Sequence, residues 1–194
     1  MFGAQRLIVG RFLFGFTLAE LLVTLMIFSC LSLMVIPSYF EYQNRHSLSM
    51  KAWEIKRALE LARSIAVSQN KEIKVCPATL DHRCAIESGV RLLVFNDSNS
   101  DHQWHQDERI YKDIGIDEFN ITLSASRRKY IRFKPSGESR ESGNILVCNA
   151  DKSDFARQII VFYSGRIRLS KDTDLDGYDN KSGRSIICKN HKVI

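Results

Sequence analysis

The chain has 194 residues, of which 44% are hydrophobic and 26% charged, and its formal net charge is +6. This balance excludes an intrinsically disordered chain, and the length suits one apolar segment followed by one domain with its own core.

An apolar run extends from Phe16 to Pro37 and contains one charged residue, Glu20. It is long enough to cross a bilayer, since a helix needs about 20 residues to span roughly 30 Å of hydrocarbon. The segment before it carries Arg6 and Arg11 and no acid, so the positive-inside bias keeps it cytoplasmic and sends the rest of the chain outward. A carboxylate in the bilayer costs about 2.5–3.5 kcal/mol, so Glu20 needs a partner or a task.

Beyond the run, apolar residues recur every four or three positions, which is typical of a helix that packs one face on a core. They are Leu48, Ala52, Ile55, Leu59, Ala62 and Ala66. We predict one helix from Phe16 to Gln69, ended by Asn70. It comprises a transmembrane or filament-core segment at residues 16–37 and an amphipathic segment at residues 38–70, after a leader at residues 1–15.

Residues 71–194 change from a helical to an alternating pattern, in short segments bounded by Gly, Pro, Asn, Asp or Ser. The predicted strands are residues 72–76, 90–95, 109–112, 120–123, 130–133, 144–148, 157–162, 166–169 and 185–188. Ser164-Gly165 is predicted to be a hairpin turn. One helix followed by many short antiparallel strands indicates an α+β chain whose β-rich head packs on the second half of the helix.

Five cysteines divide into one in the apolar run, Cys30, and four in the exported part. An even exported number suits disulfides in an oxidising periplasm. The exported ones are Cys76, Cys84, Cys148 and Cys188. Four cysteines allow three pairings, but the first two flank a short loop containing Pro77, which favours Cys76–Cys84 and leaves Cys148–Cys188. The alternative is a zinc site, although no two of these cysteines have the Cys-x-x-Cys spacing that metal sites favour.

A short basic segment ends in Gly15, the apolar run begins at Phe16, and Glu20 is the fifth residue after Gly15. This pattern resembles the class III signal of type IV pilins and type II secretion pseudopilins. The resemblance implies that a prepilin peptidase cuts after Gly15, that the new N-terminal residue, Phe16, is methylated, and that the head lies in the periplasm. It also implies a task for Glu20: its carboxylate pairs with the amine of a neighbouring pilin when subunits leave the inner membrane for a filament. The alternative is a plain single-pass anchor.

In the head, a Cys follows the helix, a second Cys lies in the next loop, Gly89 precedes the segment 93–97 (Leu-Val-Phe-Asn-Asp), and segment 165–168 (Gly-Arg-Ile-Arg) lies near the C-terminus. This order resembles the FimT/GspH branch of minor pilins and pseudopilins. The resemblance covers nearly the whole chain and implies a type IV pilin-like fold. The chain departs from it at Val90-Arg91, where the family commonly has Trp, and in its longer tail beyond Leu169.

No motif of an enzyme is present, since the five histidines are scattered and no P-loop, Gly-x-Ser-x-Gly or His-Glu-x-x-His sequence occurs. We therefore expect no catalytic activity and no cofactor. Two acidic loops resemble calcium loops incompletely. The first carries Asp172, Asp174 and Asp176, but Gly183 stands where a bidentate Glu belongs. The second carries Asp97, Asn99, Asp101 and Glu108, but His102 replaces the usual Gly. We interpret both as solvated polar turns, with calcium as the alternative.

Charge is segregated along the head: residues 95–119 have seven acids and two bases, and residues 120–171 have eleven bases and four acids. Because residues two apart on a strand point the same way, Arg166 and Arg168 should project together while Ile167 faces the core. The cluster Arg127, Arg128 and Lys129 is expected to widen this row, as are Arg132 and Lys134, and Lys171 extends it only if the strand bends. The alternative is an ordinary solvated face.

The basic row is our candidate for sequence-independent binding to the DNA backbone, which indicates a minor pilin that captures extracellular DNA in natural transformation. The alternatives are a structural priming or tip subunit of the pilus without DNA binding, and a minor pseudopilin of a type II secretion system. In each of these three cases the partners are other pilins or pseudopilins.

Cleavage after Gly15 predicts that Gly15→Ala leaves a chain longer by the leader, which enters the membrane but does not assemble. Mass spectrometry of the parent protein should give a chain that begins at Phe16. A mature chain that begins at any other residue would contradict this assignment.

Overall fold

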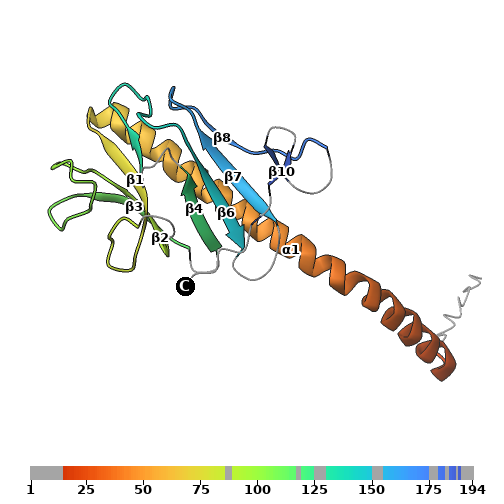
Figure 1. The fold of residues 1–194 in the computed structure, drawn as a ribbon. Helices are drawn as coiled ribbons and strands as arrows, with labels where there is room; N and C mark the ends of the chain where they lie inside the picture. Colours follow the sequence, from red (N-terminus) through yellow and green to blue (C-terminus); the bar gives the residue numbers. More distant parts are fainter. Residues whose placement is uncertain are drawn as a thin grey trace, which may run out of the picture. The chain divides into compact units, whose positions relative to one another are not determined.

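The fold is described by a computed structural model that covers residues 15–85, 89–116, 119–124, 130–149, 155–174, 179–181, 184–186 and 188 (Figure 1). The chain consists of two compact units, which comprise residues 1–42 and residues 43–194. A single helix, α1 (Leu18–Gln69), supplies most of the described part of the first unit and the beginning of the second. The second unit is the head, in which all the strands lie.

Helix α1 begins at a capping motif. The backbone N–H of Glu20 donates to Oγ1 of Thr17 at 3.2 Å, and the N–H of Leu21 donates to the Thr17 carbonyl at 3.1 Å. Thr17 is therefore the N-cap, and Glu20 is the acidic residue of the first turn, where a negative charge complements the helix dipole.

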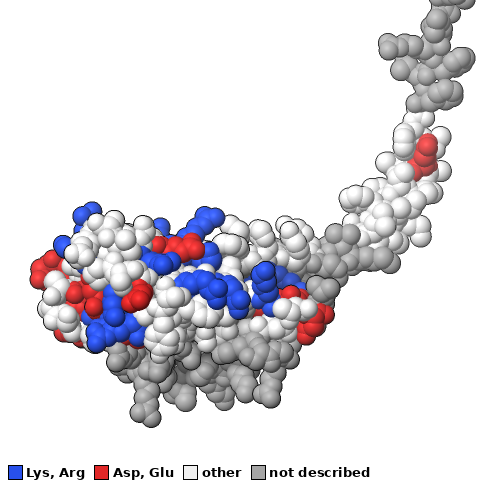
Figure 2. All heavy atoms as spheres, turned by 90° about the horizontal axis from the view of Figure 1, so that it is seen from above, with Lys and Arg blue, Asp and Glu red and all other residues white. Residues whose placement is uncertain are grey.

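The first unit exposes large apolar side chains, including Phe16 at 71%, Leu18 at 78% and Phe28 at 71%. In Figure 2 the described N-terminal part of the helix is uncharged apart from a small acidic patch. No helix among the described residues combines the length and the apolar character needed to cross a membrane.

The C-terminal end of α1 matches the predicted stop. Asn70 has a left-handed conformation, with φ of 52°, and the N–H of Lys71 donates to the Ala66 carbonyl at 3.2 Å. This is the 6→1 hydrogen bond of a Schellman cap, in which Asn is a common substitute for Gly. The chain therefore leaves the helix in the direction of the first strand.

The strands form two antiparallel four-stranded sheets, and Figure 1 shows both beside the same stretch of α1. The first has the order β3-β2-β1-β5, with β1 (Ile73–Ala78), β2 (Arg91–Phe95), β3 (Ile110–Gly115) and β5 (Ile131–Phe133). The second has the order β4-β6-β7-β8, with β4 (Phe119–Ser124), β6 (Gly143–Asn149), β7 (Ala156–Val161) and β8 (Ile167–Leu169). A small hairpin joins β9 (Asn180–Lys181) to β10 (Arg184–Ser185).

The main core lies between the second half of α1 and the inner faces of both sheets. The predicted helical stripe is confirmed, because all six of its residues are buried, among them Leu48, Ile55 and Leu59. Its partners in the sheets are Ile73, Val75, Leu92, Val94, Ile131, Phe133, Ile145, Val147, Ile159 and Val161.

A second, smaller core covers the outer face of the first sheet. It contains Leu93, Phe95, Tyr130 and the two cysteines of one disulfide, and Trp104 from the β2–β3 loop packs on it. Strand β1 is therefore buried at every residue, which its sequence, with Lys74 at the second position, does not suggest.

Two disulfides are present, Cys76–Cys84 and Cys148–Cys188, with Cα–Cα distances of 5.6 and 5.9 Å. These are the pairings that the sequence favours. Cys30 is free and exposed. The first bond closes a loop beside β1, and the second ties the tail to the end of β6 across a sequence separation of 40.

The predicted strands before the tail, from residues 72–76 to residues 166–169, each overlap an observed strand. The predicted Ser164-Gly165 turn forms between β7 and β8. The prediction is wrong in the tail. Instead of one strand at residues 185–188, the tail forms the two-residue strands β9 and β10. Strand β9 was not expected from the sequence, because two polar residues provide no alternating pattern.

We predict that the larger disulfide, Cys148–Cys188, stabilises the head mainly by restricting the unfolded chain. Restriction of the unfolded chain grows with loop length, so Cys148→Ala/Cys188→Ala should lower the free energy of unfolding by roughly 2–4 kcal/mol. Cys76→Ala/Cys84→Ala should lose less unfolding free energy through loop entropy, because its loop is shorter, but it should also lose packing in the second core. Denaturant titration of both double variants measures this, and unchanged stability of the first would refute it.

Candidate functional site

Arg166 and Arg168, the centre of the predicted basic row, belong to the β7–β8 hairpin, whose turn is closed by two backbone hydrogen bonds. The N–H of Gly165 donates to the Phe162 carbonyl at 2.8 Å, and the N–H of Phe162 donates to the Arg166 carbonyl at 3.0 Å. Gly165 has φ of 74°, a conformation that suits glycine. A Cβ there would lie 1.9 Å from the carbonyl oxygen of Gly137, so any side chain would push the two turns apart.

The hairpin turn is also tied to the rest of the head. The N–H of Ser139 donates to the Tyr163 carbonyl at 3.0 Å, and Nε of Arg63 on α1 donates to the Gly137 carbonyl at 2.8 Å. A chain of contacts therefore runs from the helix through the 134–138 turn to the tip of the hairpin. This arrangement fixes the backbone on which the arginines stand.

Arg166 and Arg168 are exposed, and Ile167 between them is half-buried against the main core. Both guanidiniums lie over the ring of Phe162, with Cζ at 4.5 Å from its centroid for Arg166 and 5.9 Å for Arg168. The two side chains thus share a face, as the strand alternation predicts. Stacking on Phe162 also restricts their rotamers, which reduces the entropy cost when they bind an anion.

The other predicted members of the row differ in their placement. Lys171 is exposed just beyond β8, where it forms an isolated bridge with Asn180. The cluster Arg127, Arg128 and Lys129 lies outside the described residues, so its place relative to the hairpin is not assigned.

Arg132 does not belong to a surface row, and this part of the prediction is wrong. It is buried, its Nη2 donates to Glu141 at 2.8 Å and its Nη1 donates to Glu72 at 3.1 Å. Burial opposes the charge, but the hydrogen bonds and charges of these two carboxylates raise the pKa of Arg132 above its usual value. Strand alternation placed its side chain on the outer face of the first sheet, but the loops that cover this face are not evident from the sequence.

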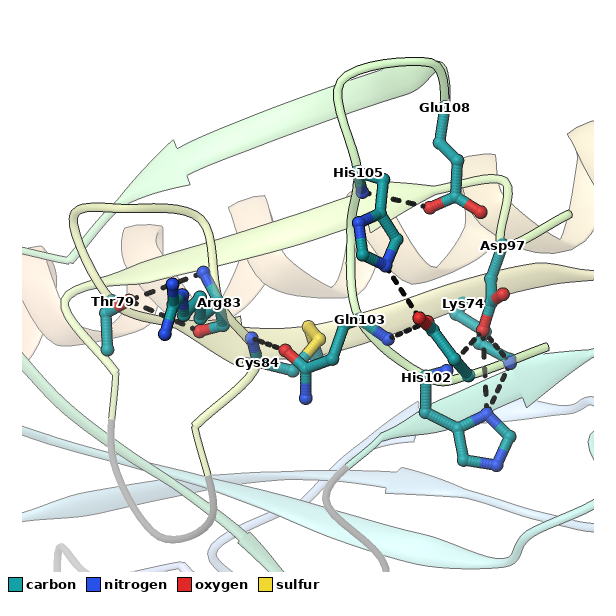
Figure 3. The surroundings of a disulfide bond; sticks show 11 residues. Lys74, Thr79, Arg83, Cys84, Asp97, His102, Gln103, His105 and Glu108 are labelled. Atoms are coloured by element: carbon teal, nitrogen blue, oxygen red, sulfur yellow. Dashed lines mark hydrogen bonds and ion pairs between the residues drawn. A yellow bond between two sulfur atoms is a disulfide. The ribbon is translucent and has the colours of Figure 1, made fainter. Parts of the chain in front are cut away.

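A second polar cluster organises the β2–β3 loop around a buried lysine (Figure 3). Lys74 and Asp97 form an ion pair in which both side chains are fully buried. The Asp97 carboxylate also accepts the N–H of Ser100 at 2.6 Å and the N–H of His102 at 2.8 Å. Nδ1 of His102 lies 2.5 Å from Nζ of Lys74. Although burial raises the pKa of the Asp97 carboxyl, these partners lower it below its usual value.

The β2–β3 loop is one of the two calcium candidates, and its carboxylates accept hydrogen bonds from backbone N–H groups of the same loop. Glu108 accepts the N–H of Ser98 at 2.7 Å and that of His105 at 3.2 Å, while Asp101 accepts the N–H of Gln103 at 2.9 Å. In the tail, Asp174 accepts Nδ2 of Asn180 at 3.1 Å, and Asp176 lies outside the described part. Within the described residues no three His, Cys, Asp or Glu side chains are grouped as a metal site requires.

The tail instead uses an aspartate that the sequence analysis did not single out. Asp179 is buried, accepts a hydrogen bond from Arg157 at 2.8 Å and is hydrogen-bonded to the Ser170 hydroxyl. The sequence gives little sign that Asp179 is buried, because its neighbours are acidic residues and glycine, as in a solvent-exposed turn. The contact holds the tail beside β7 and the end of β8.

Gly15, Phe16 and Glu20 lie at the start of α1, with Phe16 and Glu20 exposed and Gly15 without any atom within 4 Å of its missing Cβ. Glu20 also has the capping position described above, which the family motif alone does not reveal.

One helix packed on antiparallel sheets, with an apolar exposed N-terminal half, defines the pilin class of folds. The family model of GspH, a type II transport protein, matches residues 51–165, which is more than half of the chain. The chain therefore belongs to the GspH family of minor pilins and pseudopilins. A comparison with curated proteins found no match.

Solved structures with the same fold include the type IV minor pilin FimU of Pseudomonas aeruginosa. One crystal form is 20% identical, with a TM-score of 0.52, and the match covers 67% of this chain and 92% of FimU. A second crystal form of FimU is 22% identical, with a TM-score of 0.50, and the match covers 64% of this chain and 93% of FimU. The minor pseudopilin EpsH of the Vibrio cholerae type 2 secretion system is 14% identical, with a TM-score of 0.46, covering 63% of this chain and 94% of EpsH.

We predict that the buried Lys74–Asp97 pair is a main support of the β2–β3 loop. Removing one partner of a buried pair costs about 3–5 kcal/mol, so Lys74→Met should destabilise the head by this order. Lys56→Met is the control, because Lys56 forms a surface pair with Glu60 and should cost less than about 1 kcal/mol. Equal effects of the two variants in denaturant titrations would disprove the prediction.

The same pair predicts a pH dependence. The folded pKa of Asp97 lies below its unfolded value, so its contribution is present above the unfolded value, near 3.9, and disappears as pH falls through the folded pKa. Acid unfolding of the parent below about pH 4 should therefore be steeper than that of Lys74→Met.

Proposed function

We propose that the chain is a minor type IV pilin that binds DNA from outside the cell, without sequence preference, for uptake in natural transformation. It is processed after Gly15 by a prepilin peptidase, resides in the bacterial inner membrane as a single-pass protein with a periplasmic head, and then joins a filament with other pilins. The family supports membership in such a filament, and the exposed apolar side chains of α1 support the filament-core stage.

The observation that carries the DNA proposal is the arginine pair over Phe162. Two exposed guanidiniums on one face, held by a ring and by a fixed turn, form a site that can grip phosphates in bidentate geometry. The hairpin offers no helix that would enter a major groove, so recognition is confined to the DNA backbone. The function needs no cofactor and no catalytic residue.

The expected affinity of one head is weak, with a dissociation constant on the order of 1–100 micromolar at moderate salt. Several heads on one filament raise the avidity without new contacts. If about three to five phosphates are engaged, the logarithm of affinity should fall with the logarithm of salt at a slope near −3 to −4.

The second candidate function is a subunit that primes or caps a filament without binding DNA, either in a pilus or in a type II secretion pseudopilus. The specific observation in its favour is the match of residues 51–165 to GspH, a type II transport protein. Neighbouring genes for secretion or for pili and competence separate these two systems.

We predict that Arg166→Gln/Arg168→Gln weakens DNA binding several-fold. The salt slope should flatten by about two, because each arginine that is removed leaves one phosphate unneutralised. Arg83→Gln/Arg109→Gln is the matched control, because both residues are exposed, lie beside the first sheet and remove the same charge. Fluorescence anisotropy with labelled DNA at several salt concentrations measures both variants.

In cells, the hairpin variant should abolish transformation while pili still form. If it folds normally and binds DNA as tightly as the parent, the hairpin is not the site. The structural role would then be the better function.

A further inference from the structure

Tyr163 stands at the tip of the β7–β8 hairpin with 63% of its surface exposed. It directly follows Phe162, whose ring carries both guanidiniums of the arginine pair. Within the described part of the chain, Tyr163 has no ring partner and no cation over its face. An exposed aromatic ring therefore lies one residue along the chain from the ring that holds the proposed phosphate-binding cations.

The backbone of Tyr163 is fixed although its side chain is exposed. Its carbonyl accepts the Ser139 N–H at 3.0 Å, and the Gly165 N–H closes the turn on Phe162 at 2.8 Å. Gly165 is in turn packed against Gly137 so closely that no Cβ fits. Since the tip is already ordered, stacking of a ligand on the ring costs little backbone entropy.

An exposed aromatic next to cations is the arrangement with which proteins bind single-stranded nucleic acid. The cations hold the backbone while a base stacks on the ring, and stacking tolerates every base because each has a π face. In a duplex the faces of the bases are already stacked on their neighbours and are not accessible to a side chain. The two forms of DNA should therefore differ in whether they use Tyr163.

We propose that this hairpin prefers single-stranded DNA, with Tyr163 stacking on one base while Arg166 and Arg168 bind the adjoining phosphates. This inference rests on the proposed function and adds the form of DNA that the site takes. It also gives different tasks to the three side chains: the arginines set the salt dependence, and the tyrosine sets the dependence on accessible bases.

The test compares the purified full chain in neutral detergent, in parent and variant forms, with three ligands. They are an oligothymidine of about 20 nucleotides, the same oligonucleotide with abasic sites in place of its bases, and a duplex of equal length. The variants are Tyr163→Ala, Tyr163→Phe, which keeps the ring, and Trp53→Ala, which removes an exposed aromatic that lies near Lys56 on α1. Thermal melting confirms that each variant is folded.

Tyr163→Ala should weaken binding to oligothymidine about 5-fold to 100-fold, the range that stacking of one base supplies. Binding to the abasic strand and to the duplex should change less than about twofold. The salt slope should stay that of the parent, because the arginines still bind the same phosphates. Tyr163→Phe and Trp53→Ala should bind like the parent.

The outcomes separate this inference from the proposed function. If Tyr163→Ala binds all three ligands like the parent while Arg166→Gln/Arg168→Gln is impaired, the stacking role is wrong and the DNA site stands. Equally weakened binding to all three ligands would also overturn the stacking role, because it would show an effect independent of bases. If neither the tyrosine nor the arginine variant changes binding, both proposals fail.

Discussion

The head depends on one apolar face of α1, from Leu48 to Ala66, buried beneath both sheets. Among the described strands, none of the first sheet pairs with a strand of the second, so the two sheets are joined by the helix, by the side chains around it and by the contact of the 134–138 turn with the hairpin. Large residues on this face alternate with Ala52, Ala58, Ala62 and Ala66, which allow the strands to approach the helix closely. Disruption of this face would separate the arginine hairpin from the scaffold that positions it, since Arg63 contacts the 134–138 turn from the same helix.

Much of the fold is predictable from local pattern. The spacing of Leu48, Ile55 and Leu59 specifies the buried helix face, and the alternation of residues 157–162 and 166–169 specifies a hairpin. Asn70 marks the end of the helix because a left-handed residue is needed there. The order of the strands within each sheet is not predictable in this way, since it depends on pairings between segments far apart in sequence.

The same distinction holds for the polar residues. Alternation places Lys74 and Arg132 on the outer face of the first sheet, where they would be solvated if nothing covered them. The β2–β3 loop and the cysteine loop bury this face, and each cation is paired with a carboxylate. At the hairpin, the shared direction of the arginines follows from alternation, whereas the ring beneath them and the contact between Gly137 and Gly165 arise from tertiary packing.

Among the described strands, β8 forms one end of the second sheet and has three residues. An open sheet edge is a template on which another strand can pair, and proteins protect such edges by making them short and charged. Arg168 in β8 and Arg166 directly before it give this edge that protection. In a filament, where many subunits are held at high local concentration, the arginines would thus keep the sheets of neighbouring heads from merging edge to edge.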